Sequence, residues 1–175
     1  MKDLTPLSPN HDERPAGERV RLIVVHAISL PPDEFGGPGV EQLFTNTLDP
    51  DAHPYYATIH HLRVSAHYFI RRDGQTLCFV DPDRRAWHAG VSCWNGRERC
   101  NDFSIGIELE GCDTMPFEPA QYERLAALIV ALERRYPIEA VVGHSDIAPG
   151  RKTDPGPFFD WKRLDALREQ RRASC

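Results

Sequence analysis

The run RLIVVHAI at positions 21–28 constrains the fold of this chain more than any other segment. Short, continuous runs of β-branched and other apolar residues are typical of strands that are buried on both faces of a sheet. The segment that follows, SLPPDEFGGPG at 29–39, must be a loop because its prolines and glycines exclude regular structure. We therefore predict a central strand at 21–28 whose carboxyl end, with His26, opens into a long loop.

Hydrophobic periodicity divides the rest of the chain into alternating elements. Apolar residues at three- and four-residue spacing predict a helix from Pro119 to Tyr136, with the proline tolerated in the first turn. Two extended runs around Asp73-Gly74 predict a β-hairpin. The remaining expectations are helices at 40–47 and 160–172 (Asp160 as the N-cap), hairpin strands at 67–72 and 76–80, strands at 103–109 and 140–143, and loops at 49–63 and 144–159. This order predicts an α/β fold, a single domain with a mixed β-sheet flanked by helices.

Length, charge and the amino terminus narrow the class of protein. At 175 residues the chain suits one domain, which we place at 20–175, preceded by a proline- and charge-rich arm at 1–19. A net charge of -5 disfavours nucleic acid as a partner. Because the sequence has neither an apolar run of the ~18–20 residues that span a bilayer nor a signal-peptide core, we expect a cytoplasmic protein without a membrane partner. We also expect a monomer, although nothing in the sequence bears directly on oligomeric state.

Three residues of metal-ligand type stand at strand ends or in loops. His26 ends the first strand, and His144 and Asp154 lie within GHSDIAPGRKTDPG. Two histidines and a carboxylate leave the fourth position of a tetrahedral zinc ion open for water, as in hydrolytic sites. The five cysteines are odd in number and lack CxxC spacing, so we expect reduced thiols and no cysteine zinc site.

Two alternatives to this metal site remain open from the sequence. His26 as a core histidine bonded to the backbone, with Asp154 capping a turn before Pro155, has about the same generic weight. A different ligand set, such as His60 and His67 with Asp146, is also compatible with the spacing. We expect Asp146 to cap its loop near the site.

A hydrolytic zinc site also needs a general base and a cation. Glu108 is suited to the first role, since it lies on the polar side of the strand at 103–109, where an unpaired buried carboxylate would cost several kcal/mol. Lys152, two residues before Asp154, is suited to the second, although an exposed lysine is most often a solubilising charge. Arg63 and Arg99 are the arginines best placed to bind a substrate carboxylate.

Blocks of the sequence, in order and over nearly its whole length, resemble a known family. These blocks are SPNHDERP, VVHAISLPPDEFGGPGV, LFTNTLDPDAHPYY, HLRVSAHYFIRRDG, RRAWHAGVSCWNGRERCNDFSIGIELEG and GHSDIAPGRKTDPGPFFDW. They are similar to the zinc N-acetylmuramoyl-L-alanine amidases of the peptidoglycan-recognition fold, in particular to the AmpD branch. The resemblance implies Zn²⁺ on His26, His144 and Asp154, with Glu108 as the catalytic acid/base and Lys152 as the cation that stabilises the oxyanion. It also implies contacts from Tyr55, Arg63 and Arg99 to an anhydromuropeptide substrate.

The same resemblance implies a cellular role. Members of this branch cleave the amide bond between 1,6-anhydro-N-acetylmuramic acid and the L-alanine of the stem peptide during cytoplasmic peptidoglycan recycling, and thereby influence β-lactamase induction. The sequence departs from many relatives at Ala27, where they have asparagine. Loss of one hydrogen bond there, on the order of 1 kcal/mol, would affect substrate preference more than catalysis. Rival interpretations are a recognition module that only binds murein fragments, an exported amidase, and a metal-free structural protein.

Overall fold

The computed structural model describes residues 7–174 and contains five α-helices, nine β-strands and one 3₁₀ helix in that range. The strands are β1 (His11–Asp12), β2 (Leu22–Ile28), β3 (Tyr68–Ile70), β4 (Thr76–Cys78), β5 (Arg85–Ala86), β6 (Cys93–Trp94), β7 (Arg97–Glu98), β8 (Ser104–Glu110) and β9 (Ala140–Gly143). The helices are α1 (Gly39–Phe44), α2 (Pro54–Ile59), α3 (Pro119–Arg135), α4 (His144–Ile147) and α5 (Trp161–Ala173), with the 3₁₀ helix η1 at Cys100–Asp102.

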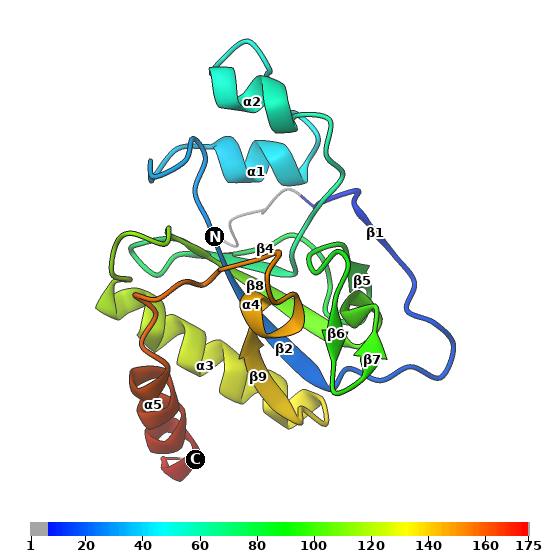
Figure 1. Ribbon diagram of the computed structural model, residues 1–175. Coiled ribbons are helices and arrows are strands. Elements are labelled where there is room, and N and C mark those ends of the chain that lie inside the picture. Colours follow the sequence, from blue (N-terminus) through cyan, green and yellow to red (C-terminus); the bar gives the residue numbers. More distant parts are fainter. Residues whose placement is uncertain (1–6, 175) are drawn as a thin grey trace.

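A five-stranded mixed sheet forms the centre of the molecule in the order β4-β3-β8-β2-β9. β2 runs parallel to both β8 and β9, β3 runs parallel to β8, and only β4 is antiparallel to its neighbour. In Figure 1, α3 lies along the sheet with α5 packed beside it, whereas α1 and α2 lie on the opposite side. The predicted α/β fold with a mixed sheet flanked by helices is confirmed.

The two faces of the sheet are both buried, as the apolar run at 21–28 predicts. Ile23 and Val25 pack into the cluster with α3 and α5, while Leu22 and Val24 belong to a second cluster on the other face. A third cluster joins α1 to β3 and β4 through Phe44 and neighbouring apolar side chains. Burial of both faces fixes the register of β2, because a one-residue slip would exchange its two sets of side chains.

Several predicted elements are confirmed by the structure. Helix α3 begins at Pro119 and extends to Arg135, and α5 has the predicted N-cap, with the Asp160 side chain accepting a hydrogen bond from the Arg163 N–H. The helix expected at 40–47 is present as the shorter α1. The β3–β4 hairpin is present, but Ile70 pairs with Thr76, so its connection spans residues 71–75 and is wider than a two-residue turn on Asp73-Gly74.

Two segments that we expected to be loops contain short helices. In 49–63, the His53 side chain accepts a hydrogen bond from the Tyr55 N–H and Pro54 occupies the first turn, so α2 forms. In 144–159, α4 follows β9 directly, and the Asp146 carboxylate accepts a hydrogen bond from the Gly143 N–H at 2.7 Å. Both predictions were wrong because a local side-chain cap supplied the acceptor that a helix start requires.

The described part of the predicted arm, residues 7–19, lies against the domain. β1 pairs with β5, and the half-buried guanidinium of Arg14 donates hydrogen bonds to main-chain carbonyls at Asn101, Asp102, Pro82 and Ser104. The first six residues of the arm and Cys175 lie outside the described residues. Within 7–174, no helix combines the length and apolar composition needed to span a membrane.

Candidate metal centre and active site

Three neighbouring parallel strands, β8, β2 and β9, bring Glu108 and the candidate ligands together at their carboxyl ends. His26 is near the carboxyl end of β2 and pairs directly with Glu108 of β8 in the parallel register. β9 pairs with the other side of β2 and ends at Gly143, so the next residue, His144, begins α4 at the same end of the strands. The loop after α4 then brings Asp154 back to this end, where ligands bind in open α/β sheets.

Three ligand atoms converge on one point. His26 Nδ1 lies 3.0 Å from His144 Nδ1, and Asp154 Oδ2 lies 3.3 Å and 3.1 Å from these two nitrogens. In the part of the chain that the structure describes, this is the one group of three histidine, cysteine or acidic side chains arranged to hold a metal ion. Two ligands about 2.0 Å from a tetrahedral ion stand about 3.3 Å apart, so these separations suit a small cation.

The hydrogen-bonding pattern around the histidines also fits a cation between them. His144 Nε2 faces the carbonyl oxygen of Ala89 at 3.1 Å, and a carbonyl only accepts, so the proton of neutral His144 resides on Nε2. Its Nδ1 then presents a lone pair toward His26 Nδ1 and the Asp154 carboxylate. Such a convergence of acceptor atoms is repulsive unless a cation lies among them, and the two-nitrogen, one-oxygen donor set is one that zinc accepts.

The alternative ligand set is not brought together. His67 is buried with its Nδ1 accepting from the Gly106 N–H and its Nε2 3.0 Å from the Arg84 carbonyl, while Asp146 caps α4 as expected. His60 is exposed at the end of α2. The interpretation of His26 as a core histidine bonded to backbone was also wrong, because both of its ring nitrogens face side chains.

The surroundings of His26 and Asp154 set the protonation of these two candidate ligands. Burial lowers the pKa of His26 to about 4, against the opposing effect of Asp154, so the imidazole is neutral at pH 7. For Asp154, burial alone would raise the pKa, but the adjacent His144 and His26 side chains hold it below its usual range. Neutral imidazole and ionised carboxylate are the forms that bind a metal, so His26 and Asp154 are both in the form suited to a metal ligand.

Glu108 is a buried carboxyl group beside this centre. Its side chain lies on the face of β8 opposite the α3 cluster, and its Oε1 is 4.0 Å from His26 Nδ1. Among residues 7–174, no group donates a hydrogen bond to its Oε2. Burial, and next the charge of Asp154, raise the pKa of Glu108 well above its usual value, while Lys152 opposes the shift. A carboxyl group whose pKa is raised in this way is typical of catalytic groups that take and return a proton.

Two of the candidate ligands, His144 and Asp154, line a cavity of about 540 Å³. Glu108 lines it as well, together with Lys152, which is exposed. The walls include Ala27, Tyr55, Leu62, Trp87 and His88. A cavity with an apolar wall and a few converging polar groups is the usual form of a small-substrate site.

The predicted substrate contacts fall in different places. Tyr55, on α2, is 40% exposed and lines the cavity. Arg63 is exposed, and its guanidinium bonds to carbonyl oxygens of its own loop, including that of His61 at 3.2 Å. Arg99 lies beside a separate hollow formed with Cys93 and Val91, and its side chain is 71% exposed. The structure therefore brings only Tyr55 of these three into the cavity with the ligands.

Sequence reasoning missed the involvement of His88. Nothing in its spacing separates it from the other histidines, and only the fold shows its ring 2.9 Å from the candidate ligand His26.

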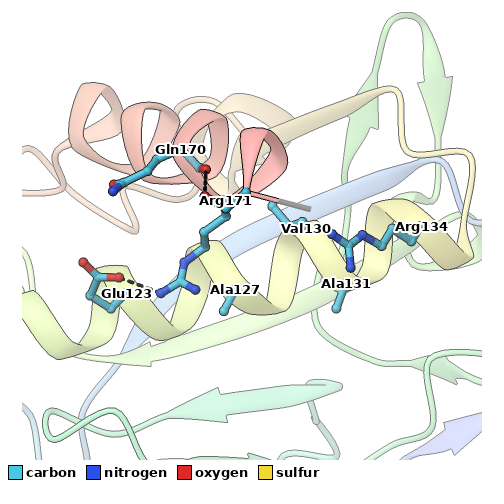
Figure 2. A pocket seen from close by; sticks show the side chains of 8 residues that line it. Glu123, Ala127, Val130, Ala131, Arg134, Gln170 and Arg171 are labelled. Atoms are coloured by element: carbon cyan, nitrogen blue, oxygen red, sulfur yellow. Dashed lines mark hydrogen bonds and ion pairs between the residues drawn. The ribbon is translucent and has the colours of Figure 1, made fainter.

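A further pocket lies between α3 and α5, away from the candidate ligands (Figure 2). It is lined by Ala127, Val130 and Ala131 with the Glu123–Arg171 ion pair, and none of the predicted site residues borders it.

Fold and site together define a class: an α/β protein with a candidate three-ligand metal site beside a buried carboxyl group, an arrangement typical of metal-dependent hydrolytic sites. The model of the Amidase_2 family, N-acetylmuramoyl-L-alanine amidase, matches residues 16–157. A protein of Enterobacter cloacae named 1,6-anhydro-N-acetylmuramyl-L-alanine amidase AmpD is 62% identical over 162 residues, covering 91% of this chain and 87% of that protein. The chain belongs to the N-acetylmuramoyl-L-alanine amidase family.

Two solved structures are similar in fold as well as sequence. A crystal structure of a selenomethionine derivative of AmpD superposes with a TM-score of 0.90 at 62% identity, covering 92% of this chain and 91% of that one. The amidase AmiD from E. coli, in complex with anhydro-N-acetylmuramic acid-L-Ala-D-gamma-Glu-L-Lys, superposes with a TM-score of 0.63 at 33% identity, covering 89% of this chain and 60% of that one.

Proposed function

We propose that this chain is a zinc amidase that hydrolyses the amide bond between 1,6-anhydro-N-acetylmuramic acid and the L-alanine of the stem peptide. The observation that carries this proposal is the convergence of His26, His144 and Asp154 beside the buried carboxyl of Glu108, in a chain 62% identical to a protein named for that activity. The anhydromuropeptide bound in the AmiD complex supports the same substrate class.

The ligand atoms in this proposal are His26 Nδ1, His144 Nδ1 and an Asp154 oxygen, which would hold Zn²⁺. When bound, zinc would polarise the substrate carbonyl and lower the pKa of a water molecule to about 7. The protein's part is to present three electron pairs to one point, in a buried setting where His26 stays neutral and Asp154 stays ionised. The cavity that His144 and Asp154 line would leave room for water and substrate beside the ion.

Glu108 is proposed as the catalytic acid/base. Its raised pKa makes the carboxylate a stronger base than an exposed glutamate, so it can take a proton from the attacking water. The same proton is then available for the nitrogen of the departing alanine, which must leave as an amine. Because no group among residues 7–174 donates to Oε2, that oxygen is free to receive the proton.

Lys152 is proposed to stabilise negative charge that develops on the carbonyl oxygen during attack. Its side chain lines the cavity with Glu108 and Asp154, and its charge acts on the pKa of Glu108. Tyr55, from the cavity wall, is proposed to contact the substrate beside the scissile bond. Arg63 and Arg99 are proposed to bind carboxylates of the peptide where it extends beyond the cavity.

The products of this reaction are a free anhydro sugar and a free stem peptide, as recycling of cell-wall fragments requires. We propose that the chain acts in the cytoplasm as a monomer in that process and so influences β-lactamase induction. Ala27 lines the cavity wall beside His26 and carries no hydrogen-bonding side chain, so substrate backbone there must be held by other groups.

The test is peptide release from anhydro-N-acetylmuramoyl-tripeptide, followed by mass spectrometry, for the purified zinc-loaded protein and Glu108→Gln. We expect the variant to bind zinc and substrate but to lose about 10²- to 10⁴-fold in kcat, because it cannot carry the proton. Glu123→Gln, in the pocket between α3 and α5, is the matched control and should retain full turnover. Binding of the anhydromuropeptide without cleavage by the zinc-loaded wild type would instead indicate a recognition module.

A further inference from the structure

His88 lies in the wall of the cavity, next to the candidate metal ligand His26. It follows β5 and is 8% exposed. Its Nδ1 is 2.9 Å from His26 Nε2, the nitrogen of His26 that does not face the other ligands. Its Nε2 is 3.0 Å from the hydroxyl of Ser104 on β8. The His88 ring therefore connects a ligand histidine to the central sheet.

The Ser104 hydroxyl determines which atom donates in each hydrogen bond of the chain Ser104–His88–His26. The Ser104 hydroxyl is 2.5 Å from the carbonyl oxygen of Cys100, and a carbonyl only accepts, so Ser104 donates to it. The remaining capacity of the Ser104 oxygen is to accept, so His88 donates from Nε2. Neutral His88 then accepts at Nδ1, and the N–H of His26 is placed on Nε2. His26 Nδ1 is left with a lone pair that faces His144 and Asp154.

The backbone of the same segment orients the second ligand histidine. The Ala89 carbonyl accepts from His144 Nε2 at 3.1 Å and from the Arg151 guanidinium at 2.7 Å. The N–H groups of His88 and Ala89 both donate to the Asn101 side-chain oxygen, at 3.1 Å and 2.8 Å. One short segment, held by Asn101, thus supplies the acceptor for the non-ligating nitrogen of each histidine ligand.

Gly106 of β8 provides the space for this arrangement. A Cβ at that position would lie 2.4 Å from Cγ and 2.6 Å from Nδ1 of the His88 ring, well inside any real carbon contact. β8 is hydrogen-bonded to a strand on each side, so it cannot withdraw to relieve such an overlap. The ring of His88 is therefore seated directly on the backbone of the sheet.

We propose that His88 is a positioning residue for the metal centre: it fixes the tautomer and ring orientation of His26, and Ser104 fixes the tautomer of His88. The inference rests on the proposed zinc function of His26, His144 and Asp154. Hydrogen-bond partners of this kind orient metal-ligating histidines, and their loss typically weakens metal binding about 10- to 100-fold.

The test compares zinc affinity, by competition with a chelating dye, in His88→Phe, His88→Asn and a matched control. Phenylalanine keeps the ring but leaves the buried His26 N–H without an acceptor, so we expect binding about 10- to 100-fold weaker. Asparagine offers an amide oxygen near the position of Nδ1 and should recover much of the affinity. The control is His67→Phe, another buried histidine whose nitrogens bond to Gly106 and Arg84; it should lose stability but keep zinc affinity within about twofold.

A second measurement keeps the inference testable if His88→Phe does not fold. ¹⁵N-histidine NMR of the zinc-loaded wild type should show His26 and His88 each protonated on Nε2, and Ser104→Ala should give a mixture of His88 tautomers with weaker zinc binding. Unchanged zinc affinity in both His88→Phe and Ser104→Ala, or His26 protonated on Nδ1, would overturn the inference. Failure of the wild type to bind zinc would overturn the proposed function itself.

Discussion

Replacement of Gly106 by alanine tests how tightly His88 is seated. Carbon atoms in contact ordinarily lie about 3.5–4.0 Å apart, whereas the added Cβ would lie 2.4 Å from the His88 ring. The ring must therefore move by at least about 1 Å. A displacement of that size is enough to break the 2.9 Å hydrogen bond to His26, since donor and acceptor beyond about 3.5 Å no longer form one.

Two consequences of Gly106→Ala follow, and they are measured separately. Overpacking of a core costs about 1–3 kcal/mol, while removing a glycine from a strand returns about 0.5–1 kcal/mol. We expect a net loss of up to about 2.5 kcal/mol, and about 1 kcal/mol from the middle of both ranges, in the free energy of unfolding of the metal-free protein, measured in urea. We also expect zinc affinity to fall about tenfold or more, because His26 loses its positioning partner.

Gly37→Ala is the matched control for Gly106→Ala. The nearest atom to a Cβ on Gly37 is 3.9 Å away, and its backbone is outside the left-handed region, so the methyl group meets no obstacle. Its stability should change by no more than about 0.5 kcal/mol, with zinc affinity unchanged. If Gly106→Ala kept the zinc affinity and stability of the wild type, the close packing of His88 against Gly106 would have no effect on the metal site, and the positioning role of His88 would be refuted.

Three further outcomes are expected. Burial lowers the pKa of His67 to about 3, so only the unfolded chain takes up a proton at this histidine as pH falls below about 6.5, and the metal-free protein should lose stability there. In urea titrations, His67→Gln should reduce the slope of unfolding free energy against pH by up to about 1.4 kcal/mol per pH unit. An unchanged slope would contradict this prediction. Lys152→Met should lower kcat about 10²- to 10³-fold with zinc affinity preserved, and full turnover would exclude its role. Arg14→Ala removes the hydrogen bonds from the guanidinium to the domain and should lower the free energy of unfolding by about 2–4 kcal/mol. The control Arg19→Ala, at an exposed position, should lower it by no more than about 0.5 kcal/mol. Equal losses would refute the proposal that Arg14 anchors residues 7–19.

The sequence was most informative where one physical requirement dominates. The β-branched run at 21–28 is typical of a doubly buried strand, and the three- and four-residue spacing after Pro119 is typical of a helix, so β2 and α3 were predicted almost to the residue. The position of His26 at the carboxyl end of β2 followed from the same run. These elements form the frame on which the candidate ligands stand.

What the sequence left undetermined depends on contacts between distant segments. α2 and α4 form because His53 and Asp146 accept backbone N–H groups, a local choice that composition does not distinguish from a loop. The role of His88 depends on its approach to His26, 62 positions away, and to Gly106 in a third segment. Arg63 and Arg99 were predicted as substrate contacts because of their charge. Charge alone does not distinguish an arginine that lines the cavity from one that lies outside it.

The most direct test of the central claim combines zinc content with peptide release from anhydro-N-acetylmuramoyl-tripeptide, before chelation, after chelation and after return of zinc. The account predicts about one zinc ion per chain, loss of release when the metal is removed, and recovery when it is restored. A chelated, metal-free protein that still releases the tripeptide at the original rate would contradict it, because His26, His144 and Asp154 would then have no part in the reaction.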